Sequence, residues 1–179
     1  MITKNNKGEY ALYDQGKLIG YEPVVQIQGV RVLRSMAPML LKMIEAAQHD
    51  GVNLTLAAGL RTWEEQYNLR KQNEKPDLYL QWQVDSKLVD HETYLTKADS
   101  KYFRPATGKP GWSNHQDGKA YDFNVTGYPE VYKWLVANAG KFYFFRTVPS
   151  ERWHWEYWPD NTDKFFKVPK NHATWDGLV

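Results

Sequence analysis

The sequence predicts an α+β fold in one domain, and three observations support this class. The chain has 179 residues, a length that one hydrophobic core can organise. Hydrophobic residues make up 42% and charged residues 25%, as in ordinary globular proteins rather than in disordered or fibrous ones. Short runs that favour strands alternate with helical segments that have recognisable ends. We therefore expect a single domain over 1–179, without linkers or repeats.

The N-terminal segment 1–28 predicts a β-hairpin. Two runs of aromatic and aliphatic residues flank Asp14–Lys17, whose sequence DQGK is typical of a tight turn. We expect these two strands to form an edge of the main sheet. A helix over 36–49 follows, because Ser35 can cap its N-terminus and Asp50-Gly51 can end it.

The next segment predicts a strand over 53–58 that leads into a second helix. Thr62 and Glu65 have the spacing of a capping box, so the helix is expected over 62–71. Arg61 then lies at a strand-to-helix junction. Folds commonly present functional side chains at such junctions.

Segment 73–112 predicts a long polar excursion with one helical stretch near 78–84. A connection of this length with little regular structure is more often functional or mobile than inert. Further along the chain we expect three strands, one helix and an irregular tail. The strands are expected over 119–125, 141–146 and 153–158, the helix over 129–139, and the tail over 159–179.

Composition restricts the chemistry that the chain can perform. The sequence contains no Cys, which excludes disulfides, thiolate metal sites and cysteine nucleophiles. A metal would have to be held by His and carboxylate side chains. The formal net charge of +2 does not indicate a nucleic-acid partner. The 8 Trp, 12 Tyr and 7 Phe residues predict an aromatic core.

Two candidate metal ligands lie in the strand at 119–125 and in the loop before it. Asp122 is expected on its outward face, because Tyr121 and Phe123 alternate with it on an apolar face. His115 precedes Asp122 by seven positions, so it cannot share that face on a regular strand. We expect a turn at Gly118 to fold the loop that carries His115 back over Asp122.

A third candidate ligand, His154, lies in the strand at 153–158. Two His and one Asp make a three-ligand zinc site with one open position, the catalytic rather than the structural arrangement. Glu151 is expected on a turn from which it can serve as general base, and Arg61 can stabilise an oxyanion. Glu156 is the rival to Glu151, although it could instead orient His154. The strand's aromatic residues are expected to pack on its other face: Trp153, Trp155 and Tyr157.

The two segments resemble the zinc D-Ala-D-Ala carboxypeptidase family. This group includes the vancomycin-resistance D,D-carboxypeptidases and D,D-dipeptidases and the L-Ala-D-Glu endopeptidases of phage lysins. The resemblance implies a small antiparallel sheet with flanking helices, the Hedgehog/D-Ala-D-Ala peptidase-like fold, with a motif core over about 36–158. It rests on Ser113-x-His115-x-x-Gly118-x-Ala120-x-Asp122, on Pro110-Gly111 before it and on Glu151-x-Trp153-His154 after it.

The resemblance also implies roles for individual residues. One Zn²⁺ per chain would be held by His115, Asp122 and His154, with Glu151 as general base. Arg61 would contact the substrate carbonyl or oxyanion. The remaining substrate contacts would be Ser113, Gln66 and Trp153. The sequence departs from the family where the usual Ser-Gly-Tyr-Arg-Ser appears as 58–62 and where Tyr143 replaces a glycine.

The function that this resemblance favours is hydrolysis of peptidoglycan stem peptides by a D-Ala-D-Ala carboxypeptidase. One alternative is an L-Ala-D-Glu endopeptidase acting as a phage endolysin or a delivered cell-wall-degrading toxin. Another is a zinc-stabilised peptidoglycan-binding module without activity. We expect a monomer that binds neither nucleic acid nor membrane. Because no signal peptide or long apolar run is evident, we expect synthesis in the cytoplasm and action on the cell wall or periplasm after release or delivery.

Overall fold

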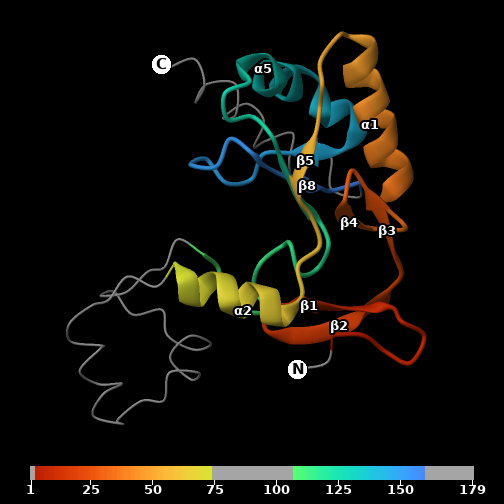
Figure 1. Cartoon of the computed structure of the whole chain (residues 1–179), viewed down its shortest axis with the longest axis vertical. Helices are drawn as coiled ribbons and strands as arrows, with labels where there is room; N and C mark the ends of the chain where they lie inside the picture. Colours follow the sequence, from red (N-terminus) through yellow and green to blue (C-terminus); the bar gives the residue numbers. More distant parts are fainter. Residues whose placement is uncertain (1–2, 74–106, 160–179) are drawn as a thin grey trace, which may run out of the picture. The chain divides into compact units, whose positions relative to one another are not determined.

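The structure is a computed structural model, and it describes residues 3–73 and 107–159 (Figure 1). The chain divides into two compact units. One unit takes Met1–Glu22 and Arg61–Asp117, and the other takes Pro23–Leu60 and Gly118–Val179. The expected helical stretch near 78–84 and the tail from residue 160 lie outside the described residues. No helix in the described ranges combines the length and the apolar character needed to cross a bilayer.

The first unit contains the predicted N-terminal hairpin. Strands β1 (Tyr10–Asp14) and β2 (Lys17–Glu22) pair antiparallel through a two-residue turn. Both turn residues, Gln15 and Gly16, have positive φ, as a type I′ turn requires. The expectation that these strands edge the main sheet is wrong, because they form a two-stranded sheet of their own. At its other edge β1 bonds to a loop and not to a strand of the main sheet: the Tyr13 amide donates to the carbonyl of Gln116 at 2.9 Å.

Helix α2 (Trp63–Gln72) also belongs to the first unit and begins as predicted. The Thr62 side chain accepts a hydrogen bond from the Glu65 amide, and the Glu65 carboxylate accepts one from the Thr62 amide. These two bonds satisfy amides that the first helical turn leaves without intrahelical partners. Arg61 therefore immediately precedes the N-cap residue of a helix whose start is defined by two hydrogen bonds.

The second unit contains a four-stranded antiparallel sheet in the order β5-β6-β8-β7. Its central strands are β6 (Ala120–Phe123) and β8 (His154–Tyr157), in register so that Asp122 pairs with His154. The outer strands are β5 (Leu56–Ala58) and β7 (Phe144–Phe145). These strands confirm the α+β class and the small antiparallel sheet.

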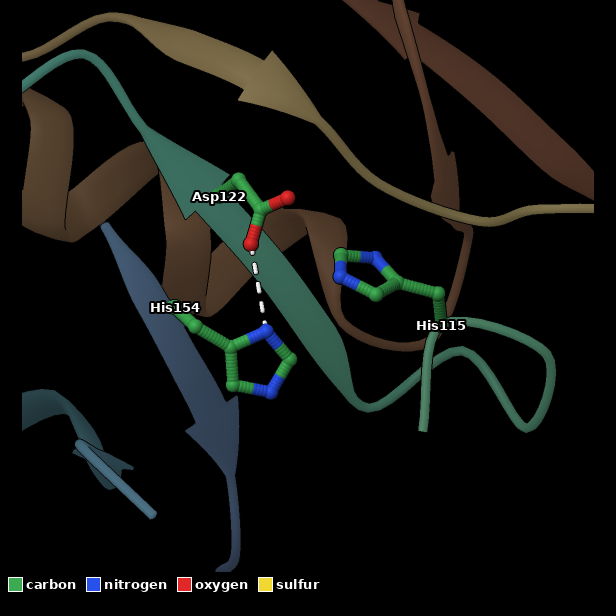
Figure 2. A group of neighbouring side chains, drawn as sticks. All are labelled: His115, Asp122 and His154. Atoms are coloured by element: carbon green, nitrogen blue, oxygen red, sulfur yellow. Dashed lines mark hydrogen bonds and ion pairs between the residues drawn. The ribbon is translucent and has the colours of Figure 1, made fainter. Parts of the chain in front are cut away.

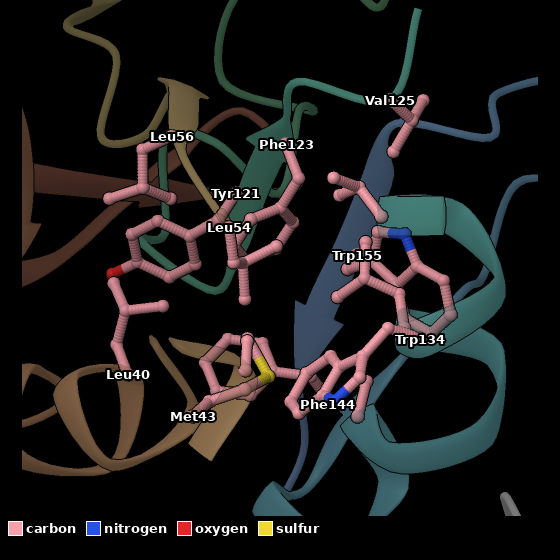
Figure 3. Packing of buried hydrophobic residues seen from close by; sticks show 14 of the residues in the cluster. Leu40, Met43, Leu54, Leu56, Tyr121, Phe123, Val125, Trp134, Phe144 and Trp155 are labelled. Atoms are coloured by element: carbon pink, nitrogen blue, oxygen red, sulfur yellow. The ribbon is translucent and has the colours of Figure 1, made fainter. Parts of the chain in front are cut away.

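The core of the second unit covers the apolar face of this sheet. Side chains of α1 (Ala37–His49) and α5 (Pro129–Asn138) meet aromatic residues of the strands (Figure 3). Tyr121 and Phe123 are fully buried there, which confirms the predicted alternation along β6. Both rings also form T-shaped pairs with the ring of Phe144.

Three local expectations are wrong. Met36, not Ser35, is the N-cap of α1, and it makes no side-chain capping bond. Residues 141–146 do not form one strand, because the 3₁₀ helix η1 (Ala139–Phe142) occupies its beginning. Trp153 precedes β8 and is 40% exposed rather than packed in the core.

A second hairpin was not predicted from the sequence. Strands β3 (Val24–Ile27) and β4 (Val30–Leu33) pair antiparallel around Gln28 and Gly29. Both turn residues have positive φ, which is unusual for glutamine. The Gln28 side chain is bound on both sides: its amide nitrogen donates to the carbonyl of Leu54, and its oxygen accepts from the amide of Leu56.

Candidate active site

The centre of the candidate site lies on the two middle strands of the four-stranded sheet. Asp122 on β6 and His154 on β8 are direct cross-strand neighbours. The Oδ1 atom of Asp122 lies 3.1 Å from Nδ1 of His154 (Figure 2). Two donor atoms on a tetrahedral zinc ion at bond lengths near 2.0–2.1 Å are separated by about 3.3 Å. The pair is therefore spaced as two ligands of one metal ion would be.

The other nitrogen of the His154 ring is occupied by Glu156. Its Nε2 atom lies 3.0 Å from Oε1 of Glu156. The second carboxylate oxygen of Glu156 accepts a hydrogen bond from the indole of Trp158 at 2.9 Å. Glu156 is buried, so both of its oxygens are used inside the protein. This geometry fixes the ring with Nδ1 directed toward Asp122.

The two carboxylates also determine the protonation of His154 in the metal-free protein. Burial by itself disfavours the imidazolium. The hydrogen bonds and negative charges of Asp122 and Glu156 outweigh burial and raise the pKa of His154 to about 9. A metal ion binds the neutral imidazole, so it would have to replace one proton at this position.

Glu151 approaches His154 from the Nδ1 side. Its Oε2 atom lies 3.8 Å from Nδ1 of His154, and its side chain is 31% exposed. The residue lies on the predicted turn, where its amide donates to the carbonyl of Val148 and its carbonyl accepts from the amide of His154. Glu151 and Glu156 therefore contact opposite nitrogens of one ring, and Glu151 is the more accessible of the two.

The loop that carries His115 begins in the first unit and is followed by the predicted turn. Gly118 has a φ of +80°, and a side chain there would overlap Leu33, so only glycine fits. The His115 side chain is buried. The main-chain carbonyl of His115 accepts a hydrogen bond from the amide of Arg61 at 2.9 Å, and the main-chain amide of His115 donates to Oγ of Ser113 at 3.4 Å.

Each of His115, Asp122 and His154 offers one ligand atom, and these three atoms lie within 4.8 Å of one another (Figure 2). Within residues 3–73 and 107–159, no other group of three His, Asp or Glu residues has this property. Two imidazoles and one carboxylate suit zinc, and three protein ligands leave a position for water or substrate. The residues present therefore fit a zinc ion.

Arg61 and Gln66, two of the expected substrate contacts, are hydrogen-bonded to each other. The Nη1 atom of Arg61 donates to Oε1 of Gln66 at 2.7 Å, and the Gln66 amide donates to the carbonyl of Gly108 at 2.8 Å. Gln66 is fully buried. Ser113 is half-buried and Trp153 is exposed. The bond between Gln66 and Arg61 is not predictable from the sequence, because the partners are five residues apart and Arg61 lies outside the helix that carries Gln66.

The fold and the donor set together define the class: an α+β chain with a two-histidine, one-carboxylate group typical of zinc hydrolases. The model of the VanY D-alanyl-D-alanine carboxypeptidase family matches residues 30–160. The chain belongs to this family, as its motifs predict.

Known proteins agree with this assignment. A D-alanyl-D-alanine carboxypeptidase of Enterococcus faecalis (strain ATCC 700802 / V583) is 32% identical over 143 residues, which cover 72% of this chain and 49% of that protein. The chain therefore spans about half the length of this curated relative.

Solved structures show the same fold. The structure of VanYB in complex with D-alanine-D-alanine has a TM-score of 0.60 at 24% identity, covering 91% of this chain and 96% of that one. A VanY D,D-pentapeptidase mutant in complex with Zn(II) has a TM-score of 0.57 at 24% identity, covering 93% and 92%. The LD-carboxypeptidase LdcB has a TM-score of 0.56 at 20% identity, covering 99% and 94%. These likenesses confirm the D-Ala-D-Ala peptidase-like fold.

Proposed function

We propose that this chain is a zinc-dependent carboxypeptidase that removes the terminal D-alanine from peptidoglycan stem peptides. The observation that carries the proposal is the grouping of His115, Asp122 and His154, with Glu151 beside the same nitrogen of His154 that faces Asp122. The family assignment supports the activity. The structures of similar proteins in complex with D-alanine-D-alanine and with Zn(II) support the proposed substrate and the proposed metal.

In this proposal His115, Asp122 and His154 hold the metal. Bound zinc would polarise the scissile carbonyl and would also lower the pKa of water, so that the attacking water loses a proton readily near neutral pH. Glu156 keeps the His154 ring oriented through Nε2, which leaves Nδ1 available as the ligand atom. The chain has no cysteine, and hydrolysis by water requires no covalent intermediate.

Glu151 is assigned the proton transfers. Its carboxylate accepts a proton from the attacking water as the oxygen bonds to the carbonyl carbon, and it passes that proton to the amine as the C–N bond breaks. The products are the shortened peptide acid and free D-alanine. Arg61 is assigned the stabilisation of the negative charge that develops on the carbonyl oxygen, because its guanidinium is a permanent cation and Gln66 holds it through Nη1.

The test is a substitution of Glu151. In Glu151→Gln we expect zinc to remain bound and kcat to fall about 10²- to 10⁴-fold, because the amide cannot accept the proton. Activity is measured by mass spectrometry of stem peptides after digestion, and zinc by metal analysis of the purified protein. Glu130→Gln, an exposed position in the first turn of α5, is the matched control and should be fully active.

The same digestion distinguishes the alternatives. Loss of a single terminal D-alanine supports the proposal, whereas cleavage between L-alanine and D-glutamate would identify an endopeptidase instead. A protein that binds zinc and muropeptides but changes no peptide mass would be a binding module. Full activity of Glu151→Gln would exclude Glu151 as the base.

A further inference from the structure

The N-terminal hairpin contacts the loop that carries two of the proposed site residues. The family model begins at residue 30, so strands β1 and β2 lie outside the matched region. Within the first unit, however, the hairpin is bound to Gly111–Gln116, which contains Ser113 and His115; we call this segment the His115 loop. Ala11, Leu12 and Tyr13 of β1 are buried, so the hairpin is not a loose extension.

Two main-chain hydrogen bonds join the hairpin to the two ends of the His115 loop. The amide of Gly16 donates to the carbonyl of Gly111 at 2.9 Å. The amide of Tyr13 donates to the carbonyl of Gln116, also at 2.9 Å. A loop held at both its first and last residue has far less conformational freedom than one held at a single point. The hairpin therefore restrains the whole segment between them.

The first of these attachments requires two glycines. Gly16 and Gly111 have φ values of +77° and +84°. A Cβ atom on Gly111 would lie only 2.7 Å from the Cα atom of Gly16, and a Cβ on Gly16 would lie 3.2 Å from Nε1 of Trp112. At Gly111 backbone approaches backbone without room for a methyl group, and at Gly16 the positive φ favours glycine, so the contact is built on both glycines.

Gln116 closes the loop from within. It is fully buried, and its side-chain oxygen accepts a hydrogen bond from the amide of Gly111 at 2.6 Å. The main-chain amide of Gln116 donates to the carbonyl of Ser113 at 2.8 Å. Gln116 thus joins the first residue of the loop, the middle of the loop and, through its carbonyl, the hairpin. The backbone of His115 lies directly between these fixed points.

We propose that the β1–β2 hairpin is a positioning element for the proposed active site. Through Gly16, Gly111 and Gln116 it fixes the backbone of the His115 loop, and thereby the place from which the His115 imidazole reaches a metal ion. The role of His115 as a ligand rests on the proposed function. The attachment of the hairpin to the His115 loop rests only on hydrogen bonds and close contacts within the first unit.

The test compares Gly111→Ala with Gly29→Ala. Gly29 is also a turn glycine with positive φ, at +80°, but a Cβ there would have no atom within 4 Å. Both substitutions carry the same kind of backbone strain, and only Gly111→Ala breaks the contact with Gly16. We expect zinc affinity, measured by competition with a chromogenic chelator, to fall about 10- to 100-fold in Gly111→Ala, as for lost outer-sphere support, and to be unchanged in Gly29→Ala.

A second readout needs no metal. The amide of Arg61 donates to the carbonyl of His115, so its hydrogen exchange reports the position of the loop. In the metal-free protein we expect the exchange of Arg61, Tyr13 and Gly16 to accelerate at least about tenfold in Gly111→Ala, while amides of β6 and β8 keep their protection. Gln116→Met, which removes the acceptor for Gly111 and replaces it with a side chain of similar length, should change the same amides in the same direction.

The outcomes separate the two proposals. If the unmodified protein binds no zinc, the proposed function fails. The hydrogen exchange of the Arg61 amide still decides whether the hairpin positions the His115 loop. If Gly111→Ala and Gln116→Met leave both zinc affinity and the exchange of Arg61 unchanged, the hairpin does not position the His115 loop. If Gly111→Ala does not fold, Gln116→Met alone decides the question by the same two measurements.

Discussion

Two glutamates contact the same histidine and are expected to do different work. Glu156 holds Nε2 of His154 from a buried position and is itself held by Trp158. Glu151 lies near Nδ1 and is partly exposed. A residue that orients a ligand and a residue that exchanges protons with water need these two environments, respectively.

Substituting Glu156 tests this division. In Glu156→Gln the acceptor of the Nε2–H proton loses its charge, so the ring is less well oriented and less basic toward a metal. We expect zinc affinity to fall about 10- to 100-fold. Chelator competition measures the change, and Glu151→Gln, which should retain full zinc affinity, is the control. Equal zinc affinity of Glu156→Gln and the unmodified protein would contradict the orienting role.

At the scale of single residues, the sequence predicted which residue types could bind a metal better than it predicted which side chains are exposed. The donor types and the alternation of β6 were readable because the strand period is two and Tyr121 and Phe123 must be buried. The prediction for Trp153 is wrong because β8 begins one residue later than the alternation indicates. Tyr143 stands where the family has a glycine. Its φ of +64° shows that the position requires the left-handed conformation that glycine adopts readily.

At the scale of elements, a side-chain hydrogen bond joins the end of α1 to α5. Asp50, the C-cap residue of α1, accepts a hydrogen bond from the indole of Trp134 at 2.8 Å. This bond, together with the neighbouring His49, lowers the pKa of Asp50 below its ordinary value of 3.8. The interaction therefore favours the charged form of an exposed carboxylate.

The pKa of Asp50 should respond to Trp134. Because the folded-state pKa is lowered, the stabilisation is present above the unfolded value of 3.8 and is lost as the pH falls through the folded value. In Trp134→Phe we expect the pKa of Asp50 to rise toward 3.8, since the indole donor is gone. A carboxyl-detected NMR titration measures it. An unchanged pKa in Trp134→Phe would show that the indole bond is not the cause of the shift.

Elements whose ends depend on local bonds were predicted best. The capping box at Thr62 and Glu65 and the turn before β2 involve residues within three positions of each other, so their sequence signals suffice. The β3–β4 hairpin was missed because Gln28 takes a positive φ that is supported by Leu54 and Leu56, far along the chain. Ser35 failed as a cap because the amides of Met39 and Leu40 bond to the carbonyl of Met36 instead.

At the scale of the whole molecule, the same strands serve the core and the proposed site. The alternation along β6 and β8 places Tyr121, Phe123 and Trp155 in the core and directs Asp122 and His154 to the opposite face. Strands that are anchored by buried aromatic rings keep the donors on their other face in fixed positions. A chain without disulfides thus obtains a rigid donor pair from aromatic packing together with the hydrogen bond between His154 and Glu156.

Zinc itself should stabilise the folded chain. A ligand that binds only the folded state adds RT ln(1 + [L]/Kd), or about 2.7 kcal/mol when its free concentration is one hundred times Kd. We expect the melting temperature of chelator-treated protein to rise with added Zn²⁺ and not with Mg²⁺, which prefers oxygen ligands. His154→Ala should abolish the rise. His49→Ala, at an exposed position, should preserve it.

Melting curves recorded at several free zinc concentrations give the result directly. In the unmodified protein the midpoint should increase with the logarithm of zinc concentration above Kd, because each tenfold increase adds about 1.4 kcal/mol. The same rise in His154→Ala as in the unmodified protein would mean that zinc binds elsewhere. Because Glu156 holds the His154 ring with Nδ1 toward Asp122, the protein itself orients these two donors, and little of the binding energy should be spent on ordering them.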